Sequence, residues 1–279
     1  MAPESHHTFN ELLLTSAGAI LGDKSSIEWT DASWNPTTGC TKVSPGCQNC
    51  YAERLAHRLK LMGNPKYQRG FDFTLQPAAL DLPLKWSEPR KIFVNSMSDL
   101  FHEEMSDEYL DQCFEVMERG DWHIYQILTK RPERLLRYSK RYGRFPAHIW
   151  VGTSVEMALY KLRIDLLRQV DATVRFISFE PLVGKVGKVN FRGISWAIVG
   201  GESGPNHRPV KIEWIRELRD QCTKQRVAFF FKQWGGHTPK SGGRILDGRV
   251  WNEYPAFVPK HSGRPAVVPV RLRSAKPKP

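Results

Sequence analysis

Short apolar runs alternate with amphipathic segments from residue 91 onward. The runs lie at 91–97, 123–130, 148–154, 173–179, 196–199 and 227–231. Unbroken apolar runs of this length indicate strands that are buried on both faces, as in a parallel sheet. Ile27, Trp29 and Trp34 add an extended segment before the first run. We therefore expect about seven strands.

Helices are predicted between these strands. Ser106 is a suitable N-cap for a helix that Gly120 ends, and Pro132 is a suitable first residue for a second helix. Apolar residues at three- and four-residue steps predict two more helices, within 159–170 and 212–222. This alternation predicts an α/β fold with a partial or complete (β/α) barrel of six to seven parallel strands. A doubly wound open sheet is the main alternative.

The composition suggests one barrel domain between two extensions. We expect a flexible N-terminal lead-in at 1–24, a barrel domain at 25–258 and a disordered tail at 259–279. The tail contains six basic residues and no acidic one. It would either be a solvated extension or contact nucleic acid.

Three of the five cysteines fall within eleven residues, with the spacing C-x6-C-x2-C. Glycine and proline interrupt the chain around Cys40 and Cys47, which places both on a loop. The apolar spacing that starts at Ala52 predicts that Cys50 opens a helix. A helix N-terminus favours the thiolate form of a cysteine.

The cluster allows three interpretations: an iron–sulfur cluster, a zinc site, or thiols without a metal, two of them joined as a disulfide. No fourth ligand is evident. His57 lies seven residues into the predicted helix, and Cys113 and Cys222 lie on the apolar stripes of other helices, as core residues do. Three ligands would leave one metal position open, which is typical of a catalytic site.

Polar residues gather where the apolar runs end. They are Asn95, Ser96, Ser98, Asp99, Thr129, Lys130, Arg131, Thr153, Ser154, Glu156, Ser178, Glu180, Glu202, Ser203, Lys232 and Gln233. Parallel α/β folds bind ligands at the carboxyl ends of their strands. We expect these side chains and the cysteines to meet in one cavity, although Thr153 or Ser154 would equally cap a helix. We expect functional roles for Lys130 and Glu180.

The formal net charge of +12 favours an anionic partner, and nucleic acid is the leading candidate. No apolar run is long enough to span a membrane. Glu4 and Glu11 precede the mildly apolar segment 12–21, which makes it a poor signal peptide. We therefore expect a cytoplasmic protein.

A first strand, a three-cysteine loop that opens a helix, and repeated βα units together resemble radical S-adenosylmethionine (radical SAM) enzymes. The chain is more closely similar to a phage-associated "three-Cys-motif" family of unassigned activity. The similarity is carried by Trp34-Asn35-Pro36, Cys40-x6-Cys47-x2-Cys50-Tyr51-Ala52-Glu53, Phe179-Glu180-Pro181 and Gly200-Gly201-Glu202-Ser203-Gly204.

This resemblance implies a [4Fe-4S] cluster on Cys40, Cys47 and Cys50, with S-adenosylmethionine on the open iron. Reductive cleavage of that cofactor would start radical chemistry on a nucleic-acid or nucleotide-like substrate. An electron donor is then required, and a partner protein is compatible with this picture. We expect Lys130 and Glu180 to be catalytic. The expected cofactor-binding residues are Tyr51, Asn95, Ser96, Ser98, Asp99, Thr153, Ser154 and Glu202.

Three features depart from the usual radical SAM pattern. The first cysteine gap is six residues where three is usual, and Asn49 stands where an aromatic residue usually precedes the third cysteine. The Gly-Gly-Glu sequence usually found after the second strand appears late, as Gly200-Gly201-Glu202. The segment 95–99 is therefore expected to line the methionine end of the cofactor.

A nucleic-acid-binding protein with a structural metal site and no catalysis is the alternative function. Its tryptophans would stack on bases, and Trp150, Trp196 and Trp234 are candidates. A metal-free hydrolase is less favoured, because the sequence contains no G-x-S-x-G, H-E-x-x-H or G-x-x-x-x-G-K-[ST] motif.

Overall fold

A seven-stranded parallel sheet organises the chain in the computed structural model, which describes residues 25–256. Both predicted extensions, 1–24 and 259–279, lie outside the described residues. The strands are β1 (Ala32–Trp34), β4 (Lys91–Val94), β5 (Ile124–Thr129), β6 (Ile149–Ser154), β7 (Arg175–Phe179), β8 (Trp196–Gly200) and β9 (Ala228–Gln233).

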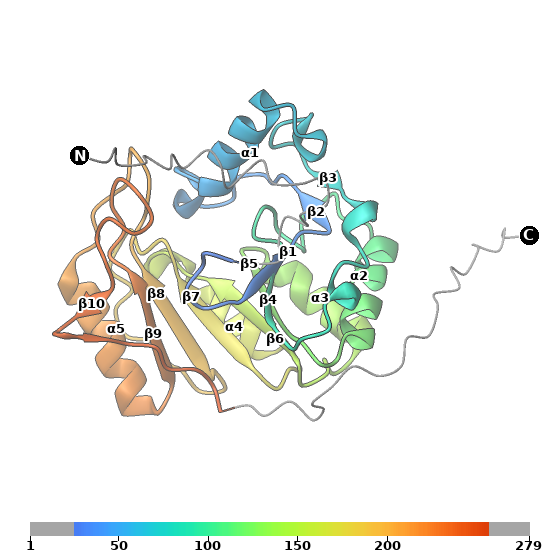
Figure 1. Cartoon of the computed structure of the whole chain (residues 1–279). Coiled ribbons are helices and arrows are strands. Elements are labelled where there is room, and N and C mark those ends of the chain that lie inside the picture. The colour runs from blue at the N-terminus through green and yellow to red at the C-terminus, as the bar shows by residue number, and fades with distance from the viewer. Residues whose placement is uncertain (1–24, 257–279) are drawn as a thin grey trace, which may run out of the picture.

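The strands follow one another across the sheet in the order β1-β4-β5-β6-β7-β8-β9, and every neighbouring pair is parallel. A doubly wound sheet reverses its strand order at an internal switch point, and this sheet does not. It curls into a half-barrel with helices around it (Figure 1). The predicted partial barrel of about seven strands is confirmed.

Figure 1 shows α2 and α5 on opposite flanks of the curled sheet, with α1 above it and apart from the other helices. The helices are α1 (Tyr51–Leu61), α2 (Asp107–Arg119), α3 (Pro132–Tyr142), α4 (Leu162–Arg168) and α5 (Ile212–Gln225). The predicted cap of α2 is confirmed, because Ser106 Oγ accepts a hydrogen bond from Tyr109 N at 3.2 Å. The described segment 180–195, between β7 and β8, contains no helix.

Short elements complete the connections. The small strands are β2 (Thr37–Thr38), paired with β3 (Thr74–Leu75), and β10 (Ile245–Leu246), paired with β11 (Arg249–Val250). Single-turn 3-10 helices are η2 (Pro45–Cys47), η3 (Pro65–Tyr67), η4 (Pro77–Ala79), η5 (Pro83–Lys85) and η6 (Ala158–Tyr160).

Successive strand residues point to opposite faces of the sheet, so each strand contributes to two cores. In β4, Ile92 and Val94 join the large core that includes apolar residues of the helices, whereas Phe93 joins a second, aromatic core. Trp150 and Trp196 belong to this second core and are only 2% and 0% exposed. The expectation that they stack on bases is therefore wrong.

The structure also places Trp234, Cys113 and Cys222, for which the sequence made predictions. Trp234 is only partly buried, and its Nε1 donates to Ile245 O at 2.9 Å. Cys113 and Cys222 are fully buried on α2 and α5, and burial raises the pKa of both thiols. Their predicted role as small core residues is confirmed.

Acid should destabilise the fold through His123. This residue is fully buried; its Nδ1 accepts from Arg90 N at 3.2 Å and its Nε2 lies 3.0 Å from Pro83 O. Burial lowers the pKa of His123 to about 4, so between the unfolded value near 6.5 and pH 4 the unfolded chain binds the extra proton. Stability should therefore fall by up to about 2 kcal/mol from pH 7 to pH 5.

Urea unfolding of the wild type and of His123→Gln at pH 7 and pH 5 measures this contribution. The variant should lose less stability than the wild type between the two pH values. Equal losses would show that His123 is not the group responsible.

Candidate functional site

The cysteine loop crosses the carboxyl edge of the half-barrel. Gly39 forms a parallel bridge with Ser98, and the backbone N–H of Cys40 donates to Phe71 O at 3.0 Å. A side chain at Gly39 would lie 2.1 Å from Asp72 O, and its φ of +80° also favours glycine. Cys47 ends η2, and Cys50 is the N-cap of α1, so the predicted helix start is confirmed.

One cavity of about 580 Å³ brings nearly all the predicted site residues together. Its lining includes Cys40, Cys47, Cys50, Tyr51, Asn95, Ser96, Ser98, Asp99, Lys130, Ser154, Glu180 and Glu202. Of the polar strand-end residues expected in this cavity, Thr153 and Glu156 do not line it. Thr153 is fully buried, and its Oγ1 donates to Thr129 O at 3.0 Å. The shared location is observed, whereas the individual roles remain predictions.

Glu156, a buried carboxylate two residues after the end of β6, binds the cysteine loop. Glu156 is 0% exposed; it accepts a hydrogen bond from Ser44 Oγ at 2.5 Å and another from Arg163 Nη1 at 3.0 Å. Lys130 Nζ lies 3.8 Å from the same carboxylate. A side chain at Gly46 would lie 2.4 Å from Glu156 Cγ. The loop therefore rests directly on Glu156, and only glycine leaves room for this contact.

A second buried carboxylate holds the loop from the end of β8. Arg208 Nη2 donates to Glu202 Oε1 at 2.5 Å, and Asn49 Nδ2 donates to Glu202 Oε2 at 3.0 Å. Burial opposes ionisation of Glu202, but the hydrogen bonds from Arg208 and Asn49 outweigh it and lower the pKa of this carboxyl. Arg208 also donates to Pro45 O at 2.9 Å. Both oxygens of Glu202 thus bind protein groups that position the loop.

A third anchor comes from β4 and β5. Asp99 accepts from Thr129 Oγ1 at 2.7 Å and from Arg131 Nη1 at 3.2 Å. Arg131 in turn donates to Thr41 Oγ1 at 2.6 Å, and its Nη1 lies 3.6 Å from Cys40 Sγ. Burial and the Asp99 charge raise the pKa of Cys40 to about 11, while Arg131 opposes this rise. A positive group thus accompanies the first thiol.

Further polar residues line the cavity: an ion pair, a buried amide and a tyrosine. Glu180 pairs with Lys232 at 3.1 Å, and both line the cavity. Asn95 is 2% exposed with φ +61°, and its Oδ1 has no hydrogen-bond partner within residues 25–256. Tyr51 OH donates to Ser96 O at 2.5 Å. The cavity wall therefore contains an ion pair and, buried within it, an amide oxygen without a partner among residues 25–256.

The three thiols fit some of the proposed groups better than others. No two of them form a disulfide. Within the described residues, no set of three or more His, Cys, Asp or Glu side chains is placed to hold a single metal ion. A structural zinc site needs such convergence. An iron–sulfur cluster would take each thiolate on a different iron, and the three thiols all line one cavity, so that interpretation stays a prediction.

Sequence reasoning missed three residues that hold the loop: Asn49, Arg163 and Arg208. Each acts through a carboxylate at a strand end, and Asn49 is 153 positions from its partner Glu202. Asn49 occupies the place where radical SAM enzymes usually carry an aromatic residue, and its side chain contacts Glu202. Apart from the polar residues at the strand ends, no local pattern in the sequence indicates these pairings.

Residues 24–255 match the family described as "Protein of unknown function (DUF5131)", and the chain belongs to that family. Comparisons with curated proteins and with solved structures found no match. None of the helices in the described part of the chain has the length and apolar character needed to cross a membrane.

Removing the charge of Glu156 should destabilise the protein. In Glu156→Gln, buried Arg163 loses its counter-charge, which should lower the free energy of unfolding by about 3 kcal/mol. Glu115→Gln is the control, because Glu115 is exposed on α2 and this change should cost less than about 0.5 kcal/mol. Denaturant unfolding measures both, and equal midpoints for the two variants would contradict the anchoring role.

Proposed function

We propose that this chain is a radical SAM-like enzyme with a [4Fe-4S] cluster on Cys40, Cys47 and Cys50. It would cleave S-adenosylmethionine reductively and act on a nucleic-acid or nucleotide-like substrate. The observation that carries the proposal is the placement of three free thiols on one cavity at the carboxyl edge of a half-barrel. The resemblance to radical SAM enzymes and to phage-associated three-Cys-motif proteins supports it.

When bound, the cluster and its cofactor would supply the one-electron chemistry, using an external electron donor. The protein's part is to bind, orient and shield. Arg131 places positive charge beside Cys40, which offsets part of the negative charge of the thiolates. The hydroxyl of Ser96, which lines the cavity, is an acceptor suited to the amino group of a methionine moiety.

Lys130 and Glu180, which line the same cavity, would bind groups of the substrate. Lys130 lies 3.8 Å from Glu156, longer than a hydrogen bond, so its ammonium retains donors for a substrate oxygen. Glu180 lies 3.1 Å from Lys232 Nζ, and a carboxylate oxygen at this position can accept a hydrogen bond from a substrate.

A nucleic-acid-binding protein with a structural metal site is the second candidate. The net charge of +12 favours it, although the burial of Trp150 and Trp196 removes two of its expected base contacts. The two candidates differ in one product: only the enzyme releases 5′-deoxyadenosine from the cofactor when a reductant is added.

Cluster loading should depend on the three loop cysteines alone. Anaerobic reconstitution of the wild type should give about four irons and four sulfides per chain. Replacing Cys40, Cys47 or Cys50 with alanine should remove most of this iron. Cys222→Ala is the matched control and should load normally, because that thiol lies in the core on α5. One zinc per chain, or iron retained in the triple variant, would refute the proposal.

Ser96→Ala should weaken binding of S-adenosylmethionine to the reconstituted protein by about tenfold, the value of one well-placed hydrogen bond. Thr153→Ser is the control, since Thr153 is outside the cavity lining and serine keeps its hydrogen bond. Isothermal titration calorimetry measures both affinities. An unchanged affinity in Ser96→Ala would remove this residue from the cofactor site.

A further inference from the structure

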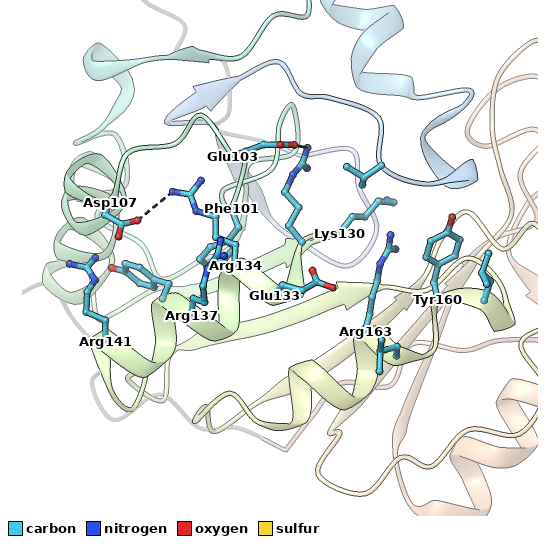
Figure 2. Close-up of a pocket in the computed structure, with 15 residues that line it drawn as sticks. Phe101, Glu103, Asp107, Lys130, Glu133, Arg134, Arg137, Arg141, Tyr160 and Arg163 are labelled. Carbon is cyan, nitrogen blue, oxygen red and sulfur yellow. Dashed lines mark hydrogen bonds and ion pairs between the residues drawn. The ribbon is translucent and has the colours of Figure 1, made fainter.

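A second cavity, of about 800 Å³, adjoins the cysteine loop on the side of α3 (Figure 2). Three acidic side chains line it against six basic ones, which are Lys130, Arg131, Arg134, Arg137, Arg141 and Arg163. We call this cavity the arginine groove. Figure 2 shows the arginines of α3 on one side of the groove, Tyr160 and Arg163 on the other, and Lys130 between them. The excess of positive charge suits a polyanion.

Arg134, Arg137 and Arg141 are spaced i, i+3 and i+7 on α3, so they share one helix face over about 10 Å. Arg134 is held by the carbonyl oxygens of His102 and Met105, and Arg141 pairs with Asp111 at 2.6 Å at the surface. Arg137 is exposed and has no hydrogen bond or ion pair within residues 25–256. The groove thus contains at least one cation that is free to bind a phosphate.

The opposite wall is apolar and accessible. Leu159 and Leu162 are 77% and 66% exposed, and Val43 from the cysteine loop is 37% exposed. Tyr160 lies beside them, with the guanidinium of Arg163 4.3 Å from its ring centroid. Exposed apolar groups and a half-buried aromatic ring opposite a basic helix suit unpaired bases, whereas a duplex presents mainly its phosphates.

The arginine groove adjoins the thiol cavity. Val43, Lys130 and Arg131 line both. Arg131 contacts Cys40 on one side and belongs to the basic lining on the other. A polymer lying along α3 would therefore pass directly beside the cysteine loop.

We propose that the arginine groove binds single-stranded nucleic acid. Phosphates lie along Arg137 and its neighbours, and bases contact the wall that Tyr160, Leu159 and Leu162 form. The position of the groove next to the thiols makes this strand the substrate, and that part of the inference rests on the proposed function. Binding itself does not require the cluster.

Fluorescence anisotropy with the full-length chain tests this proposal. The probes are 12-nucleotide DNA and RNA single strands of the same sequence, and a DNA duplex, each at 50 and 200 mM salt. We expect at least one single strand to bind more tightly than the duplex, and the comparison of DNA with RNA identifies the sugar that is preferred. Tighter binding of the duplex, or no binding of either single strand, would overturn the proposal.

Arg137→Glu should weaken single-strand binding at least tenfold and reduce the slope of log K against log salt by about 0.7, the value of one lost phosphate contact. Lys140→Glu is the matched control. It makes the same charge change at an exposed position of α3 that does not line the groove, and it should cost less than twofold. Equal losses in the two variants would mean that binding follows net charge alone and would overturn the proposal.

Tyr160→Ala should weaken binding about tenfold without changing the salt slope, because a base contact releases no counterions. An unchanged affinity would exclude the base-contacting wall.

Formation of 5′-deoxyadenosine by the reconstituted wild type, measured without any oligonucleotide, separates the two proposals. Oligonucleotide binding without cofactor cleavage would refute the proposed radical SAM-like activity. Cofactor cleavage without oligonucleotide binding would refute the proposal that the arginine groove binds single-stranded nucleic acid.

Discussion

The contact between buried Glu156 and the cysteine loop is the interaction on which the site most depends. A carboxylate that is 0% exposed is stable only when it is paired, and Arg163 and Ser44 provide that pairing. Because Gly46 packs against the same side chain, the loop cannot move without exposing or unpairing a buried charge. The end of β6 thereby fixes the position of the segment between Cys40 and Cys47.

The same arrangement of a strand-end carboxylate and an arginine occurs twice more. Asp99 with Arg131 holds the region of Cys40, and Glu202 with Arg208 holds the segment that leads to Cys50. Three strands at separate places in the sheet therefore position one loop. Acidic residues at these strand ends therefore have a structural role, to hold the loop, that differs from cofactor binding. The ion pair of Glu180 and Lys232 also lies on the cavity wall, and within the described residues it forms no hydrogen bond or ion pair with the loop.

Much of this structure follows from the sequence. The apolar runs and helix spacing predicted the parallel half-barrel, and the capping residue Ser106 placed the start of α2. The cysteine loop and the meeting of polar strand ends follow from parallel topology. Alternation of side chains along a strand places Thr153 and Ser154 on opposite faces of β6, and only Ser154 lines the cavity.

Other features depend on tertiary contacts that no local pattern encodes. Trp150 and Trp196 sit in strands whose two faces are both covered, so their aromatic character reflects packing in the second core. Arg208 and Asn49 lie in irregular segments, and their roles arise only when β8 brings Glu202 to the loop. The arginine groove needs α3, α4 and the cysteine loop side by side, which residue spacing within α3 alone does not reveal.

Mössbauer spectroscopy of the chain reconstituted with ⁵⁷Fe, with and without S-adenosylmethionine, tests the central claim most directly. The account predicts the signal of a [4Fe-4S] cluster in which one iron of the four changes its parameters when the cofactor is added. A spectrum without a four-iron cluster, or a cluster whose irons are all unaffected by the cofactor, would contradict it.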